Sequence, residues 1–219
     1  MYHGIDAADR ARVIEWLGVS RETVERLDIF IAELDRWRSI TNLISAAAWP
    51  SLWSRHIADS AQLLRFAPHV KNWADLGTGA GFPGLVIAIL LGEAPDAVVH
   101  LVESDKRKIA FLTQTARLVS APVKIHAGRI DAILPAHSPT PEIVTARALA
   151  PLAALIDWTE PLLKKGAVGL FLKGQSIQAE LTQVPRLDTY TFRVIENSAM
   201  HNGCIVSVTF NSKSKLAAQ

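Results

Sequence analysis

The sequence has a single cysteine and no long apolar run. Cys204 on its own excludes an internal disulfide framework and a cysteine-rich zinc site. The longest apolar run, Leu85–Leu91, is far shorter than the roughly 20 residues that a helix needs to span a bilayer. The first residues, MYHGIDAADRARV, hold no apolar core of the signal-peptide kind. These absences favour a cytoplasmic protein without a membrane segment.

A strong excess of charge of either sign is also lacking. The formal net charge is +2, and the sequence pI is about 8.8. This balance permits an anionic partner such as RNA without requiring one. The seven histidines show no metal-ligand spacing, so no metal site is predicted. A solvated surface explains the basic residues better than an RNA-binding track if charge is the only criterion. They recur at Arg10, Arg12, Arg21, Arg26, Arg36, Arg38, 106–108, Lys213 and Lys215.

Apolar residues in the first 70 positions repeat with helical spacing. Ser20 is a good N-cap, and Glu22 lies in the first turn, where the helix dipole favours a carboxylate. A second helix is predicted to start at Pro50, which suits a first helical turn. The sequence therefore predicts an N-terminal helical extension over residues 1–70 that docks on the rest of the chain. Its apolar positions are Val24, Leu27, Ile31, Leu34 and Trp37 in the first helix and Trp53, Ile57 and Leu64 in the second.

From residue 71 the pattern changes to short β-rich runs that alternate with helical segments. This alternation predicts βαβ units and a parallel sheet. The last two runs, DTYTFRVIE and CIVSVTF, are separated only by NSAMHNG, which indicates an antiparallel hairpin. Five parallel strands and such a hairpin form the Rossmann-like seven-stranded sheet of an α/β, class I methyltransferase domain, predicted over 71–211 before a basic tail at 212–219. The helical segments are Leu85–Gly92, Lys106–Val119, Leu152–Lys165 and Ile177–Val184.

The stretch DLGTGAGFPG, residues 75–84, follows the first predicted strand. Gly77, Gly79 and Gly81 keep side chains away from an incoming ligand. Glu103 ends the second strand with a carboxylate at the distance where such folds bind a ribose diol. A tight turn that packs helix on strand would need the same glycines. The acidic residue downstream favours a ligand that carries a nucleoside.

Two nucleoside ligands fit this glycine loop. Gly79, Gly81 and Gly84 satisfy the G-x-G-x-x-G pattern of nicotinamide and flavin enzymes. However, Asp75 places a carboxylate where a cationic ligand is favoured and a pyrophosphate is not. The closing hairpin also fits methyltransferases and does not fit dehydrogenases. We therefore expect S-adenosylmethionine, whose adenosine would meet Glu103 and whose positive sulfonium and amine would meet the loop.

The groups predicted after the fourth strand narrow the choice of methyl acceptor. Methylation of a pyrimidine at carbon 5 needs a covalent cysteine, and Cys204 is expected to lie away from that loop. The Asn/Asp-Pro-Pro-aromatic motif that holds an exocyclic amine is absent, and no lysine and acid set indicates ribose methylation. Guanine N7 has a free lone pair and needs no general base. Small molecules with a free lone pair pass the same test.

The order of motifs resembles that of the ribosomal small-subunit methyltransferase G family, also called the glucose-inhibited division protein B family. Two of the matching segments, RHIADS at 55–60 and DLGTGAGFPG at 75–84, are specific when they occur together. The family methylates N7 of one guanine in 16S rRNA, with S-adenosylmethionine as donor, by in-line displacement. The other matching segments are Arg36–Ala46, ESDKRKIAFL (103–112), AGRID (127–131), TARALAPL (145–152) and LFLKGQ (170–175).

The resemblance also implies roles for individual residues. Gly77 and Phe82 would contact the donor, and Glu103 would hold its ribose hydroxyls. Ile130, through its backbone N–H, and Asp131, through its carboxylate, would lie beside the adenine. Arg147 would lie near the methionine end of the donor or the incoming base.

Three further side chains are candidates for placing the substrate. Arg55 and Asp59 are four residues apart on a predicted helix, so they could form a surface ion pair or could face the mouth of the active site. Lys173 ends the fifth strand, and we favour an RNA contact for it over a solvated position. The expected partner is 16S rRNA within the small subunit or its precursor, and the protein is expected to be a monomer. A small-molecule methyltransferase, and a ribosome-binding protein with a vestigial pocket, are the alternatives.

Overall fold

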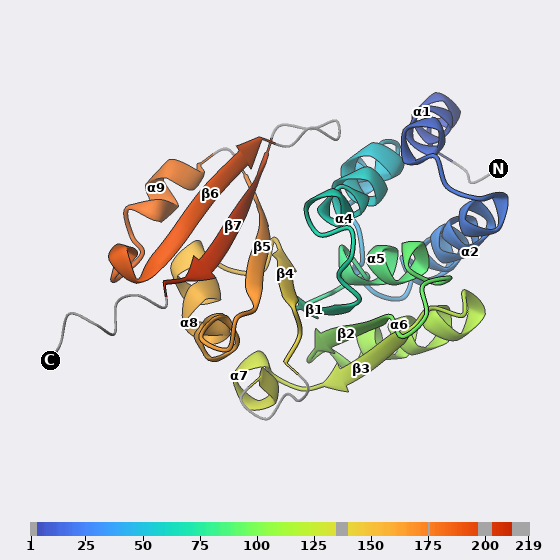
Figure 1. Cartoon of the computed structure of the whole chain (residues 1–219). Coiled ribbons are helices and arrows are strands. Elements are labelled where there is room, and N and C mark those ends of the chain that lie inside the picture. The colour runs from blue at the N-terminus through green and yellow to red at the C-terminus, as the bar shows by residue number, and fades with distance from the viewer. Residues whose placement is uncertain (1–3, 135–139, 175, 197–202, 212–219) are drawn as a thin grey trace, which may run out of the picture.

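The computed structural model describes residues 4–134, 140–174, 176–196 and 203–211. A seven-stranded sheet with the order β3-β2-β1-β4-β5-β7-β6 forms the centre of the molecule (Figure 1). The first five strands are parallel, and β7 pairs antiparallel with both β5 and β6. The strand inventory and the C-terminal hairpin predicted from the sequence are therefore confirmed. The strands are β1 (Asn72–Leu76), β2 (Val98–Glu103), β3 (Val123–Ala127), β4 (Ile143–Arg147), β5 (Val168–Lys173), β6 (Tyr190–Glu196) and β7 (Cys204–Phe210).

The strand order reverses between β1 and β4. From β1 the chain moves outward through β2 to β3 and then returns to pair β4 with the other edge of β1. Ligands of open α/β sheets bind in the crevice outside the carboxyl ends of the strands at such a reversal. The structure therefore directs attention to the residues that follow β1, β2 and β4.

Helices cover both faces of the sheet (Figure 1). Apolar side chains of α2, α5 and α6 share one buried cluster, and those of α8 and α9 belong to a second cluster on the other face. Alternate residues of β5 show the division, because Leu170 and Leu172 belong to the first cluster and Phe171 to the second. The helices are α1 (Ala7–Leu17), α2 (Arg21–Trp37), α3 (Asp59–Ala61), α4 (Leu63–Phe66), α5 (Gly84–Leu90), α6 (Lys106–Leu118), α7 (Ile130–Ile133), α8 (Leu152–Leu163) and α9 (Ile177–Leu181).

Several predicted helix ends extend too far along the chain. The four helices predicted after residue 71 begin within one residue of their expected positions and end one to three residues early. The clearest case is α9, which ends at Leu181 and not at Val184. Val184 precedes Pro185, and the residue before a proline is disfavoured in helical conformation.

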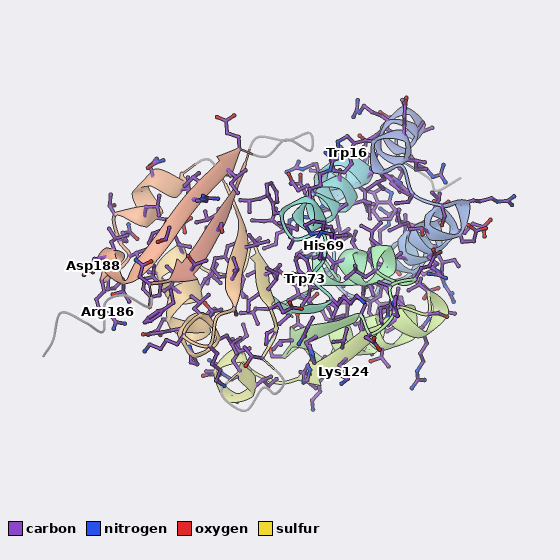
Figure 2. All side chains as sticks on the ribbon, in the orientation of Figure 1. Trp16, His69, Trp73, Lys124, Arg186 and Asp188 are labelled. Atoms are coloured by element: carbon purple, nitrogen blue, oxygen red, sulfur yellow. The ribbon has the colours of Figure 1, made fainter. Side chains whose placement is uncertain are left out.

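The N-terminal helices pack into the same core as the sheet. Three fully buried aromatic residues belong to one hydrophobic cluster with α5 and α6. They are Phe30 of α2, Trp53 of the segment after Pro50 and Trp73 of β1. Figure 2 labels Trp73 in the interior, among the side chains that fill the space between these elements. The predicted N-cap is also confirmed, because Ser20 Oγ accepts a hydrogen bond from the backbone N–H of Thr23 at 3.2 Å. The docking predicted for this segment is thus confirmed.

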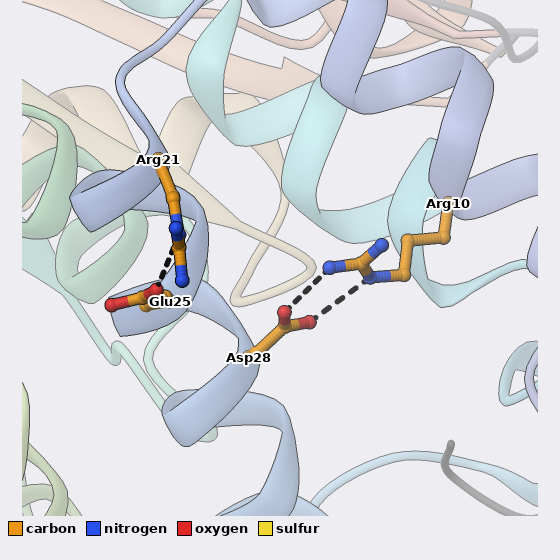
Figure 3. A network of polar contacts seen from close by, with 4 residues as sticks. All are labelled: Arg10, Arg21, Glu25 and Asp28. Atoms are coloured by element: carbon orange, nitrogen blue, oxygen red, sulfur yellow. Dashed lines mark hydrogen bonds and ion pairs between the residues drawn. The ribbon is translucent and has the colours of Figure 1, made fainter.

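The arginines of α1 and α2 are engaged in ion pairs. Arg10 Nε lies 3.0 Å from Asp28 Oδ1, and this pair joins α1 to α2 (Figure 3). Arg21 Nε lies 2.9 Å from Glu25 Oε1 on α2 itself. Acidic partners also neutralise Arg12, Arg36 and Arg38. These contacts support the solvated-surface interpretation of the N-terminal basic residues over an RNA-binding track.

The second N-terminal helix differs from the predicted one. Pro50 lies in a turn before it, and Trp53–Ala58 form a π-helix, η2, rather than a regular α-helix. Its start is fixed by α1, because Asp9 Oδ2 accepts a hydrogen bond at 3.0 Å from the backbone N–H of Ser54. Arg55 therefore lies in a π-helical turn, and Asp59 directly follows it.

Some sequence expectations concern absences or the chain end. In the part of the chain that the structure describes, no helix is long and apolar enough to cross a bilayer. The same residues contain no group of three or more side chains that could hold a metal ion. The basic tail predicted at 212–219 lies outside the described residues.

Close packing of α5 on β1 generates a prediction for Gly84. A Cβ atom added there would lie 2.6 Å from Asp75 Cβ and would also collide with the Leu101 side chain. Because both neighbours are buried, we expect Gly84→Ala to lower the free energy of unfolding by about 1–3 kcal/mol, despite the better helix propensity of alanine. Urea denaturation measures the change. Gly174→Ala is the control because no atom of the described residues lies within 4 Å of its added Cβ. Equal stability of the two variants would contradict the packing argument.

Candidate functional site

Two cavities flank the residue that follows β4. The first cavity has a volume of about 300 Å³ and the second a volume of about 250 Å³. Ala148 lines both, so the loop between β4 and α8 forms the wall between them. The first cavity is lined by Gly77, Val102, Glu103, Ser104, Lys108, Gly128, Arg129, Ile130, Asp131, Ala148, Leu149 and Trp158. The second is lined by Arg55, Asp59, Arg147, Ala148, Leu172, Lys173, Gly174, Glu180, Gly203 and Cys204.

Gly77 brings the backbone to the edge of the first cavity. It directly follows β1 and has φ of +59°, a left-handed conformation that favours glycine. A Cβ atom at this position would lie 2.5 Å from Leu149 Cδ1. The absence of a side chain therefore lets the loop after β4 approach the loop after β1.

Glu103 fixes the glycine loop at the carboxyl end of β2. Its Oε2 accepts a hydrogen bond from the Gly79 N–H at 2.9 Å, and its Oε1 accepts from the N–H groups of Ser104 and Asp105 at 2.8 and 2.9 Å. The residue is 7% exposed and lines the first cavity. A carboxylate oxygen has two lone pairs, so Oε2 retains capacity for a ligand hydroxyl. Gly79 therefore does not line the first cavity. Its backbone N–H instead holds the Glu103 side chain in place.

The far wall of the first cavity is formed by the start of α7 and by side chains from other elements. Ile130 and Asp131 both line it, and their contact with an adenine stays a prediction. Asp131 Oδ1 lies 3.3 Å from Arg129 Nε, and both side chains are mostly exposed. Lys108 of α6 and Trp158 of α8 also line the cavity, although neither was predicted. Lys108 belongs to the basic run 106–108, and nothing in the sequence around Trp158 indicates where α8 packs.

Phe82 lies in the core. Its ring is 4.9 Å from the His56 ring in a stacked arrangement and 5.2 Å from the Phe30 ring. The residue is 7% exposed and is absent from the lining of the first cavity. Phe82 therefore joins the glycine loop to η2 and α2, and direct packing on a ligand stays a prediction.

Asp75 does not occupy the position that the charge argument assumed. Its side chain is buried beneath the loop, where Oδ2 accepts from the Gly84 N–H at 2.9 Å and Oδ1 from Thr145 Oγ1 at 2.9 Å. Burial raises the pKa of this carboxyl to about 6, against opposing effects of Thr145, Gly84 and Arg147. The assumption that it faces a cationic ligand was wrong, because the first N–H of α5 and the neighbouring strand take up its oxygens.

The second cavity brings together three charged residues from distant segments. Arg55 and Asp59 come from the π-helical region and Arg147 ends β4, and all three line the cavity. Burial lowers the pKa of Arg147, an effect that Asp59 opposes and Arg55 strengthens. Arg147 Nη1 is buried, and no residue of the described chain accepts a hydrogen bond from it. Arg55 and Asp59 thus lie at this cavity, and their role in placing a substrate stays a prediction.

Cys204 lies closer to the loop after β4 than the sequence suggested. Because β7 inserts next to β5, its first residue lines the same cavity as Ala148, and the expectation that it lies away from this loop was wrong. Burial and the Glu180 charge raise the pKa of the thiol, although Lys173 acts in the opposite direction. Its Sγ also donates to the Gly174 carbonyl at 3.7 Å. A thiol held in this way is a poor nucleophile, so the conclusion against covalent pyrimidine chemistry keeps its support.

Lys173 is held within the protein. Its ammonium lies 2.6 Å from Glu180 Oε2 and donates to the Ala150 carbonyl at 2.9 Å. Only 10% of the side chain is exposed. Glu180 was missed by sequence reasoning because it lies on α9, whose position beside the end of β5 depends on the tertiary fold.

Sequence comparison shows close relatives of this chain. Residues 23–203 match the model of a family described as rRNA small subunit methyltransferase G. A protein of that name from Methylobacterium radiotolerans is 54% identical over 80% of this chain and 82% of its own length. Another from a Bradyrhizobium species is 51% identical over 81% of this chain and 80% of its own length.

Solved structures share the fold at low sequence identity. A methyltransferase from Geobacter sulfurreducens aligns with a TM-score of 0.59 at 12% identity, over 84% of this chain and 89% of its own. A mutant of MtNAS in complex with S-adenosylmethionine aligns with a TM-score of 0.56 at 15% identity, over 84% of this chain and 72% of its own. These similarities, together with the strand order, establish the class I methyltransferase fold.

The buried carboxyl of Asp75 generates a prediction about pH. Its pKa is raised from 3.8 to about 6 in the folded state, so its contribution to stability is fully present below about pH 3.8 and is lost as the pH rises through about 6. We expect the unfolding free energy of the wild type to fall, relative to that of Asp75→Asn, by the order of 3 kcal/mol between pH 4 and pH 7. Urea titrations of both proteins at several pH values measure this difference. A difference that stays constant would show that Asp75 is ionised at no cost in the folded state.

Proposed function

Because the chain belongs to the rRNA small subunit methyltransferase G family, we propose that it transfers a methyl group from S-adenosylmethionine to guanine N7 of 16S rRNA. The observation that carries the proposal is the pair of adjoining cavities that share Ala148. One contains a carboxylate suited to a ribose, and the other contains a guanidinium with an unfilled hydrogen-bonding position among the described residues. A donor and an acceptor in these cavities would meet at the end of β4.

The first cavity fits a nucleoside-bearing donor. Glu103 already accepts hydrogen bonds at the end of β2, and its remaining lone pairs suit the two ribose hydroxyls. Ile130 and Asp131 would flank the adenine, and the side-chain-free edge at Gly77 leaves room for the donor. Bound S-adenosylmethionine supplies an activated methyl group on a positively charged sulfur. The task of the chain is to hold it in one orientation.

The second cavity fits an acceptor that needs no deprotonation. The nucleophile in this proposal is the N7 lone pair, so Arg147, Arg55 and Asp59 have to place the base and neutralise charge. A guanidinium N–H can donate to guanine O6, which lies next to N7 on the same edge of the base. Methylation leaves the guanine ring positively charged, and the Asp59 carboxylate in this cavity would offset that charge. No residue is assigned as a general base.

Methylation of ribosomal particles tests the proposal. Small subunits from cells that lack this gene would be incubated with the protein and methyl-labelled S-adenosylmethionine, and the labelled nucleoside would be identified after digestion of the RNA. We expect 7-methylguanosine at one position of the 16S rRNA, matching the methylation that disappears from the cells when the gene is deleted. Label that appears in a small molecule and not in RNA would favour the alternative acceptor.

A variant in the second cavity serves as the control for this experiment. We expect Arg147→Met to reduce methyl transfer by about a hundredfold or more, since one preorganised charged donor contributes on this scale. Its affinity for S-adenosylhomocysteine should stay close to that of the wild type, because Arg147 does not line the first cavity. Loss of donor binding in this variant would place Arg147 with the donor and not with the base.

Glu103 provides a prediction for the first cavity. Glu103→Gln retains the shape of the side chain but replaces one acceptor oxygen with a donor group, which conflicts with at least one of the three N–H groups that it binds. We expect the dissociation constant for S-adenosylhomocysteine, measured by calorimetry, to rise by about tenfold or more. Thermal stability should also fall, because the Gly79 loop loses an anchor. Asp131→Asn is the comparison, with a smaller expected effect because its carboxylate is mostly exposed. Unchanged affinity in Glu103→Gln would remove this residue from the site.

A further inference from the structure

The Lys173–Glu180 pair holds the loop between β4 and α8 from two sides. Lys173 donates to the Ala150 carbonyl at 2.9 Å, and Glu180 Oε2 accepts from the Leu152 N–H at 2.6 Å. The Lys173 ammonium and Glu180 Oε2 form an ion pair at 2.6 Å, and the two side chains are 10% and 23% exposed, respectively. The Ala150 carbonyl lies in the loop that separates the two cavities, and the Leu152 N–H lies directly after it, at the first residue of α8.

The sequence explains why this loop needs an external anchor. Pro151 occupies the N-cap of α8 and offers no side-chain acceptor for the first N–H groups of the helix. Glu180 supplies that acceptor from α9, and its negative charge is favoured at the helix N-terminus. The Ala150 carbonyl lies on the other side of Pro151 and receives the Lys173 ammonium. The pair thus replaces a local cap with one from two other elements.

The position of the loop determines the shape of the first cavity. Ala148 has φ of +48°, a conformation that is uncommon for a residue other than glycine, so surrounding contacts must maintain it. Leu149 follows and lies against Gly77, so close that a Cβ atom on Gly77 would be 2.5 Å from Leu149 Cδ1. Ala148, Leu149 and Gly77 all line the first cavity. A shift of the loop would therefore alter the first cavity, although Lys173 and Glu180 line only the second.

We propose that Lys173 and Glu180 are positioning residues that clamp the wall between the two cavities and thereby support donor binding in the first one. This role replaces the direct RNA contact expected for Lys173. The inference rests on the proposed function only in taking S-adenosylmethionine as the ligand of the first cavity. The acceptor can be an RNA or a small molecule without affecting it.

Hydrogen exchange of the protein without ligand tests the clamp itself. We expect Glu180→Ala to increase the exchange rate of the Leu152 amide by about tenfold or more, because its acceptor is removed. Lys173→Met should increase exchange in the same segment through loss of the Ala150 contact. Glu160→Ala is the matched control, since this carboxylate is also ion-paired, to Lys164 and Arg186, and contacts neither Ala150 nor Leu152 in the described structure. Unchanged exchange in both clamp variants would overturn the proposal.

Donor affinity tests the consequence for the first cavity. We expect Glu180→Ala and Lys173→Met each to raise the dissociation constant for S-adenosylhomocysteine by about tenfold, which corresponds to about 1.4 kcal/mol, at a temperature where all variants remain folded. Lys173→Arg retains a positive charge and several donors, so it should keep the affinity within about twofold of the wild type. The control Glu160→Ala should do the same even if it lowers the melting temperature.

The alternative role gives a different set of results. If Lys173 contacts RNA directly, Lys173→Met weakens binding of small subunits and leaves both hydrogen exchange and donor affinity unchanged, which overturns the clamp. Failure of the proposed function looks different, since wild-type protein would then bind the donor without methylating rRNA, or would not bind it. In either case the exchange of the Leu152 amide still decides whether the clamp exists.

Discussion

The buried carboxylate of Asp75 joins three elements at the point where the strand order reverses. Asp75 lies one residue before the end of β1, and its carboxyl accepts hydrogen bonds from the N–H of Gly84, the first residue of α5, and from the hydroxyl of Thr145 in β4. Removing an acid from water is costly, and its raised pKa records that cost. The hydrogen bonds fix the approach of α5 and β4 to β1, and the two cavities lie directly beyond this junction. The position of the site therefore depends on a side chain that does not line either cavity.

Charge is distributed unevenly between the helical extension and the site. The arginines of α1 and α2 that form the contacts in Figure 3, and others nearby, are neutralised by acidic partners on their own or the neighbouring helix. Exposed pairs of this kind contribute little to stability, but they also leave little unbalanced positive charge on that surface. In the second cavity, by contrast, the charged residues among the described lining are Arg55, Arg147 and Lys173 on one side and Asp59 and Glu180 on the other. This small excess of positive charge, placed in a partly enclosed space, suits a single anionic or electron-rich group better than a long stretch of phosphates.

Much of the fold and part of the site followed from the sequence. Periodicity identified the strands and the closing hairpin, and the glycine loop with Glu103 located the first cavity, because these features depend on neighbours along the chain. The orientation of Asp75, the burial of Phe82 against His56 and the engagement of Lys173 by Glu180 could not be predicted. Each depends on which side chain of a distant element lies opposite. The π-helical turn at Trp53–Ala58 was missed for a different reason, since helical periodicity alone does not distinguish it from an α-helix.

The shared core of the N-terminal helices and the sheet has a consequence for modular exchange. Phe30 and Trp53 belong to the cluster that contains Trp73, and α1 reaches across to the start of η2 through Asp9. A shortened protein that kept only the sheet and its crossover helices would expose a large apolar surface to water and would be prone to self-association. The N-terminal helical extension therefore cannot be exchanged for that of a distantly related protein as an independent unit. Recombination between lineages would have to carry the opposing sheet residues along with it.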